Sequence, residues 1–166
     1  MAVTTRITPC LWFDTRAEEA ARFYVSIFPG SGIDHVSRYG KAGFEVHGKP
    51  AGSVMTVAFH LGIQPVVALN GGPQFRFTEA VSLQVFCDGQ EEVDRYWARL
   101  TDGGEEGPCG WLKDRFGLSW QVIPTAMGQL LGAPDSPGAE AAFRAMMQMR
   151  KLDLAAMRKA FDSAKG

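Results

Sequence analysis

The chain has 166 residues, with 17 Lys plus Arg against 18 Asp plus Glu, and 46% of its residues are hydrophobic. This size and composition predict a single domain, residues 1–166, that buries its own core without disulfides or a structural metal. The balanced charge disfavours nucleic-acid binding, and no apolar run approaches the roughly 18 residues that a membrane span needs.

The N-terminus and the cysteines indicate the compartment. Residues 1–8 lack the long apolar core and cleavage site of a signal peptide. The three cysteines, Cys10, Cys87 and Cys109, are odd in number and widely spaced, which suits neither a zinc site nor a CxxC redox motif. We therefore expect a cytoplasmic protein with reduced thiols and no disulfide.

The first predicted module spans about residues 5–72 and has the order βαβββ. A β-rich run at 7–13 is typical of a strand, and an amphipathic helix follows, with Asp14 or Thr15 as its N-cap and Gly30 as its stop signal. The apolar positions at helical spacing are Ala17, Ala20, Ala21, Tyr24 and Phe28. Three further strands are expected at about 33–38, 54–60 and 66–70.

The second predicted module, about residues 78–125, repeats the first at an offset of 73 residues, so that Pro9 to Phe13 falls on Ser82 to Phe86 and Phe23-Tyr24 falls on Tyr96-Trp97. Several matches kept in register indicate a duplicated unit. Its helix follows Asp88, a candidate N-cap, and its strands are expected at about 81–87, 105–109, 111–113 and 118–123.

A C-terminal tail, about residues 137–163, is predicted to be helical. Ser136 is a candidate N-cap with Pro137 at the first helical position, and Asp153 caps a second helix over 154–161. Methionines add apolar bulk to this tail, which favours packing against the body or a partner chain over ligand sensing. The fold class is therefore α+β: two βαβββ modules that form a curved, mostly antiparallel sheet cup, plus C-terminal helices.

Three stretches carry a resemblance to a known family. They are Trp12-Phe13-Asp14 with Ala17 to Tyr24, Ala68 to Pro73, and Cys109 to Asp114 with Phe116 to Gln121. Together they resemble the vicinal oxygen chelate superfamily (glyoxalase, bleomycin resistance, dioxygenase), in the PhnB-like branch labelled "3-demethylubiquinone-9 3-methyltransferase". The resemblance covers about residues 5–162 and implies the duplicated βαβββ fold.

The resemblance also implies where a divalent metal would be held, commonly by His and Glu on the first and last strands of the modules. Those positions fall on Pro9, Ser82, Gln121 and the vicinity of Ala68 or Asn70. Transition metals prefer imidazole, carboxylate or thiolate ligands, and none of these residues supplies one. The single histidines His35, His47 and His60 form no ligand pair. We expect no metal and no cofactor.

Strand alternation predicts which side chains line the cup. With Pro9 and Ser82 facing inward, the expected ligand-binding residues are Leu11, Phe13, Asn70, Gln84, Phe86, Ser119 and Gln121. Apolar walls with neutral hydrogen-bonding groups suit a small organic ligand with carbonyl or hydroxyl groups. Two alternatives stay open: the polar groups satisfy one another across the sheet, and Lys113 either meets an anionic ligand or forms a surface turn with Asp114.

Three functions are compatible with these patterns. The first is a metal-free small-molecule-binding protein or uncharacterised enzyme, and no catalytic residue is assigned. The alternatives are a metal-dependent lyase, isomerase or dioxygenase with substitute ligands, and the methyltransferase that the family label asserts. The expected partners are a small organic ligand and a second copy in a homodimer, because open sheet edges and an apolar tail favour pairing, and neither nucleic acid nor a membrane is expected.

Overall fold

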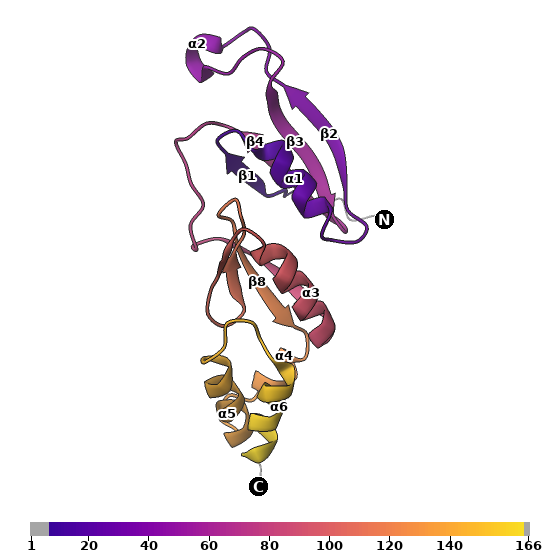
Figure 1. Cartoon of the computed structure of the whole chain (residues 1–166), viewed down its shortest axis with the longest axis vertical. Helices are drawn as coiled ribbons and strands as arrows, with labels where there is room; N and C mark the ends of the chain where they lie inside the picture. The colour runs from indigo at the N-terminus through magenta and orange to yellow at the C-terminus, as the bar shows by residue number, and fades with distance from the viewer. Residues whose placement is uncertain (1–6, 165–166) are drawn as a thin grey trace. The chain divides into compact units, whose positions relative to one another are not determined.

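The computed structural model describes residues 7–164 and divides the chain into two compact units, one ending at Arg76 and one beginning at Phe77. Each unit contains one βαβββ module (Figure 1). The predicted α+β class, with two such modules and C-terminal helices, is confirmed. None of the helices within residues 7–164 combines the length and the apolar character that crossing a bilayer requires.

The first unit is a four-stranded sheet covered on one face by a helix. Its elements are β1 (Cys10–Phe13), α1 (Ala17–Val25), β2 (Gly32–Arg38), α2 (Phe44–His47), β3 (Val54–Leu61) and β4 (Gln64–Asn70). The strand order is β1-β4-β3-β2, with β1 parallel to β4 and the other pairs antiparallel. Tyr24 of α1 stacks on Phe59 of β3, with 6.3 Å between ring centroids, and both side chains are buried. The core therefore lies between α1 and the sheet.

The second unit repeats this plan. Its elements are β5 (Ser82–Cys87), α3 (Gln90–Thr101), β6 (Glu105–Glu106), β7 (Trp111–Lys113), β8 (Ser119–Pro124), α4 (Met127–Leu131), α5 (Pro137–Met146) and α6 (Leu154–Ser163). The strand order is β5-β8-β7-β6, with β5 parallel to β8. Val93, Tyr96, Trp97 and Leu100, predicted to share one helix face, are all buried in α3.

The C-terminal helices pack within the second unit, where α5 and α6 lie side by side (Figure 1). Ser136 caps α5 through the backbone N–H of Ala139, and Asp153 caps α6 through that of Ala156, as predicted. Their apolar cluster is formed by Leu130, Ala142, Met146, Leu152, Leu154 and Met157. The backbone N–H of Gly110 donates to the carbonyl of Arg150 over 2.7 Å, which ties the tail to the strands of its own unit.

Three local predictions are wrong. The N-cap of α1 is Arg16 without a side-chain cap bond, rather than Asp14 or Thr15, and the Ala17 N–H donates instead to Oδ1 of Asn70 over 2.8 Å. The N-cap of α3 is Gly89 rather than Asp88. The strand expected at 105–109 ends at Glu106, because Pro108 lacks an N–H and Cys109 has a φ of 55°, which an extended strand does not accommodate.

Candidate functional site

The open face of the second sheet is the face that α3 leaves uncovered. Trp120 and Val122 of β8 and Leu112 of β7 are buried on the covered face, so the alternate residues lie on the open face. Cross-strand register arranges these residues in three rows. The rows are Glu105, Lys113, Ser119 and Ser82; then Trp111, Gln121 and Gln84; then Ile123 and Phe86.

The chemical character of this face changes along the strands. The first row holds charges and hydroxyls, the second holds amides and an indole, and the third is apolar. Nε2 of Gln121 donates to Oγ of Ser82 over 2.8 Å, and Nε2 of Gln84 donates to Oε1 of Gln121 over 3.4 Å. These polar groups partly satisfy one another, as the alternative interpretation of the sequence held.

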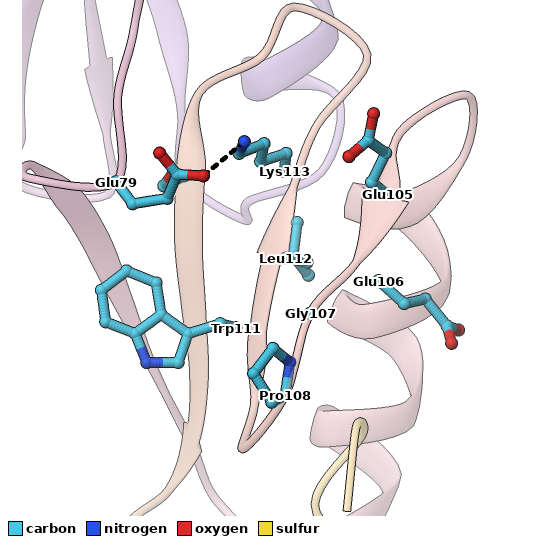
Figure 2. A pocket seen from close by; sticks show the side chains of 9 residues that line it. Glu79, Glu105, Glu106, Gly107, Pro108, Trp111, Leu112 and Lys113 are labelled. Carbon is cyan, nitrogen blue, oxygen red and sulfur yellow. Dashed lines mark ion pairs between the residues drawn. The ribbon is translucent and has the colours of Figure 1, made fainter.

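A pocket of about 390 Å³ opens beside the first two rows (Figure 2). Its lining consists of Glu79, Glu105, Glu106, Gly107, Pro108, Trp111, Leu112, Lys113 and Ser119. The Ser119 side chain is fully buried, and its Oγ has no hydrogen-bond partner among residues 7–164. A buried hydroxyl without a partner costs about 1–3 kcal/mol, so this atom is a candidate contact for a ligand.

An ion pair crosses the upper part of the pocket in Figure 2, where the Glu79 carboxylate meets the Lys113 ammonium over 2.5 Å. The hydrogen bond to Glu79 raises the pKa of Lys113, and the same bond lowers the pKa of Glu79. Both groups are therefore charged at neutral pH. The sequence left open whether Lys113 pairs with Asp114 in a surface turn, and the structure pairs it with Glu79 instead.

Asp114 has a different role, because its carboxylate is buried and faces its own hairpin. Oδ1 accepts from the backbone N–H groups of Phe116 and Leu118, over 2.8 and 3.1 Å, and Oδ2 accepts from Nε1 of Trp120. These bonds fix the turn between β7 and β8. Asp114 thereby holds in place the two strands that present Lys113 and Ser119.

The predicted site residues fall into two groups. Gln84, Phe86, Ser119 and Gln121 share the open face of the second sheet, as strand alternation predicted. Phe86 and Ile123 border a second hollow of about 450 Å³ at the apolar end of that face. Ligand contact by these four residues stays a prediction.

The predicted orientation of Leu11, Phe13 and Asn70 is wrong. All three are buried on the face of the first sheet that α1 covers, and Asn70 bonds the first N–H of that helix. The open face of β1 instead carries Cys10 and Trp12. Of these two, Trp12 donates its indole N–H to the carbonyl of Gly72 over 2.8 Å.

A one-residue difference between the modules causes this error. Three residues, 14–16, separate β1 from α1, whereas two, 88–89, separate β5 from α3. The helices therefore match at an offset of 73 and the strands at 74, so that Phe13 corresponds to Cys87 rather than to Phe86. A shift of one residue moves every side chain of a strand to the other face. The sequence did carry a sign of this difference in loop length, because the first module has two candidate N-caps, Asp14 and Thr15, and the second has only Asp88.

Sequence reasoning also missed Trp111 and Glu79 as pocket residues. Trp111 and Lys113 flank the buried Leu112 in β7, an alternation that is visible in the sequence. Glu79 lies before β5 outside any strand or helix, and no local pattern marks it.

The residues at the predicted metal positions do not fit a transition-metal site. On the open faces, β5 and β8 offer hydroxyls and amides, and β1 offers one thiol, at Cys10. Within residues 7–164 no group of three or more His, Cys, Asp or Glu side chains is placed to hold a metal ion. Hydroxyl and amide groups are weak ligands for such ions, so no step of the chemistry is assigned to a metal.

Comparisons with known proteins agree with this architecture. The family model "3-demethylubiquinone-9 3-methyltransferase" matches residues 5–123. The chain is 33% identical to a structure described as a putative 3-demethylubiquinone-9 3-methyltransferase, PhnB protein, from Bacillus cereus; the match has a TM-score of 0.63 and covers 73% of this chain and 100% of that one. No curated protein matches the chain.

More distant solved structures are also similar to this chain. Protein PA1353 from Pseudomonas aeruginosa shares the fold at 21% identity, with a TM-score of 0.58, over 73% of this chain and 98% of that one. A glyoxylase/bleomycin resistance protein/dioxygenase domain from Frankia sp. is 14% identical, with a TM-score of 0.47, over 74% and 93%. Because the family model spans more than half of the sequence, the chain belongs to the 3-demethylubiquinone-9 3-methyltransferase family, to which the PhnB protein from Bacillus cereus is also assigned by its description.

Proposed function

We propose that the chain binds a small organic ligand on the open face of the second module and does so without a transition metal. The observation that carries the proposal is Ser119, whose buried Oγ lies at a pocket without a hydrogen-bond partner among the described residues. A pocket that combines apolar walls with a few convergent polar groups is the usual form of a small-molecule site. Trp111 and Pro108 supply the walls here, and Ser119 and Lys113 supply the polar groups.

Binding is better supported than acid–base catalysis at this site. An efficient general acid or base has a pKa near the working pH. The ion pair moves the pKa of Lys113 upward and that of Glu79 downward, away from neutrality in both cases. The pocket therefore holds and orients polar groups, and these two residues do not exchange protons near pH 7.

The methyltransferase activity in the family label has no separate support in this site. Each module has a βαβββ order with a mixed four-stranded sheet, whereas the doubly wound nucleotide-binding architecture alternates strands and helices around a parallel sheet. Calorimetric titration with S-adenosylmethionine tests this activity directly, and we expect no binding heat.

The proposal is tested by a fragment screen on the full chain, followed in the indole N–H region of a proton–nitrogen NMR spectrum. Among the four tryptophans, Trp12 donates to Gly72 and Trp120 donates to the buried Asp114, so the indole signals of these two residues serve as internal references. A ligand in the pocket should move the Trp111 signal most. Binding fragments that shift only the reference signals would contradict the proposed site.

Ser119→Ala is the matched variant for this screen. It should weaken a fragment that bonds the hydroxyl by about tenfold, given about 1–2 kcal/mol for a hydrogen bond. Ser26→Ala is the control, because Ser26 is exposed at the end of α1 in the first unit. Equal affinities in the two variants would show that the Ser119 hydroxyl makes no ligand contact.

A further inference from the structure

We infer that the ligand of this pocket is a small carboxylate and that Glu79 occupies its position on Lys113 until it binds. This inference rests on the proposed function and names its ligand class. Glu79 is the only carboxylate described as bonded to the Lys113 ammonium, over 2.5 Å, and a free carboxylate presents the same atoms. The carboxylate of the ligand would therefore take the place of the Glu79 carboxylate.

The row that contains Lys113 also contains the group that completes a carboxylate site. Lys113 and Ser119 are direct partners across β7 and β8, so their Cβ atoms are about 4.5–5.5 Å apart on one face. An ammonium and a hydroxyl both donate hydrogen bonds, and a carboxylate has two oxygens that accept them. One ligand head group can therefore bond Lys113 and satisfy the unpartnered Oγ of Ser119.

Little energy holds the Glu79 carboxylate on the Lys113 ammonium. It lies in the segment before β5, outside any strand or helix, and its side chain is 64% exposed against 37% for Lys113. Exposed ion pairs contribute little to stability because water competes with both partners. Displacing Glu79 from Lys113 thus opposes ligand binding only weakly, by about two- to fivefold in affinity.

The charges around the pocket admit an anionic ligand only in exchange for Glu79, because three carboxylates of the lining face one ammonium. Lys113 is the one cationic side chain of the pocket lining. Glu106 is engaged elsewhere, since its Oε1 accepts from Nε1 of Trp97 over 2.9 Å. Glu105 lies beside Lys113 in the same row and repels an anion. When an incoming carboxylate displaces Glu79, the Lys113 ammonium keeps one carboxylate partner.

The rest of the ligand is constrained by the same pocket. Trp111 and Pro108 line it with apolar surface below Lys113 in the view of Figure 2, and an aromatic or aliphatic body attached to the carboxylate would lie against them. Phenylacetate is a suitable probe, because phenylacetamide has nearly the same shape without the charge.

The experiment titrates phenylacetate and phenylacetamide into the full chain and into Glu79→Gln and Lys113→Met variants, with the Trp111 indole signal as the readout. Phenylacetate should bind Glu79→Gln about two- to fivefold more tightly than the unaltered protein. The Lys113→Met variant should bind phenylacetate at least about tenfold more weakly than the unaltered protein. Phenylacetamide should bind equally to all three. Glu105→Gln is the electrostatic control, because it removes a nearby charge that bonds no lysine in the described structure.

The outcomes separate this inference from the proposed function. If Glu105→Gln and Glu79→Gln raised the affinity for phenylacetate equally, only the local charge would matter. That result would overturn the inference that the ligand displaces Glu79 from Lys113. Equal binding of acid and amide at Trp111 would reject the carboxylate class and leave the proposed pocket standing. Absence of phenylacetate binding in both the unaltered chain and Glu79→Gln would reject the inference.

Discussion

Nε1 of Trp120 donates a 2.8 Å hydrogen bond to Oδ2 of Asp114, and both side chains are buried. The same carboxylate accepts from two backbone N–H groups of the hairpin. Asp114→Ala should lower the free energy of unfolding by about 3–5 kcal/mol, because it leaves three donors, two of them buried, without their acceptor. Urea denaturation followed by tryptophan fluorescence measures the loss. Asp162→Asn, at an exposed position in α6, should change it by less than about 0.5 kcal/mol.

The Gly71→Ala substitution should disturb the first unit. A Cβ at residue 71 would overlap the Trp12 ring, and the neighbouring Phe75 ring contacts that indole at 5.0 Å between centroids. We expect a loss of about 1–3 kcal/mol, typical of overpacking, and a shifted Trp12 indole signal. Gly40→Ala is the control, since nothing lies within 4 Å of its added Cβ. A Trp12 signal that stays in place would refute the close contact.

The thiols should differ in reactivity. Cys87 is fully buried, and burial raises its pKa to about 11, whereas Cys10 is exposed. At about pH 8 a thiol reagent should modify Cys10 first and Cys87 only after unfolding, as peptide mass analysis would show. Modification of Cys87 as fast as Cys10 in the folded protein would contradict the buried position.

The Cys87 thiol also predicts a dependence of stability on alkaline pH. The folded protein keeps a proton that the unfolded chain releases from about pH 9, the ordinary pKa of this thiol. The contribution of this thiol to the free energy of unfolding is therefore fully present below about pH 9 and is lost between pH 9 and about 11. Cys87→Ala should show a smaller fall in unfolding free energy over this range than the unaltered chain, and identical falls would contradict the raised pKa.

We predict that the purified chain binds no stoichiometric transition metal. In the second module, the positions that the resemblance assigns to metal ligands hold Ser82 and Gln121, which offer no imidazole, carboxylate or thiolate. Elemental analysis after mild dialysis is the measurement. One metal ion per chain would show that other residues supply a site.

We also predict a homodimer, on the grounds that β2 and β6 are open sheet edges and that twofold pairs are the commonest assemblies. Sedimentation equilibrium at micromolar concentration distinguishes it from a single chain of 18.1 kDa. Since Gly110 and Cys109 bond the tail within one unit, deleting residues 137–166 should lower stability and leave the dimer intact. A monomeric deletion variant would place the contact on the tail.

The sequence predicted best those elements that have a clear hydrophobic period or a helix N-cap close by in the chain. The strand at 111–113 and the capped helices after Ser136 and Asp153 have the expected bounds to within a few residues. Two short helices, α2 and α4, were missed, since four or five residues are too few to show a helical period. The cap from Asn70 to Ala17 spans 53 residues, and no local pattern reveals a partner at that distance.

The site residues also separate into those whose orientation the sequence predicted correctly and those whose orientation it did not. Gln84, Ser119 and Gln121 were placed correctly because β5 and β8 alternate without interruption. Leu11, Phe13 and Asn70 were not, because the strands were aligned with the offset of 73 residues that holds for the helices, whereas the strands correspond at 74. No sequence rule marks Glu79, since only the folded chain brings it to Lys113.

The unequal loops at 14–16 and 88–89 bear on how the two halves have diverged since duplication. An exposed turn between a strand and a helix tolerates a gained or lost residue, because neither core is disturbed. The change nevertheless alters which positions are equivalent. Engineering that transplants the pattern of Ser82, Gln84 and Phe86 into the first half must count in the frame of the strands, where the recipients are Thr8, Cys10 and Trp12. Counting in the frame of the helices would place the donor side chains on the face that α1 covers.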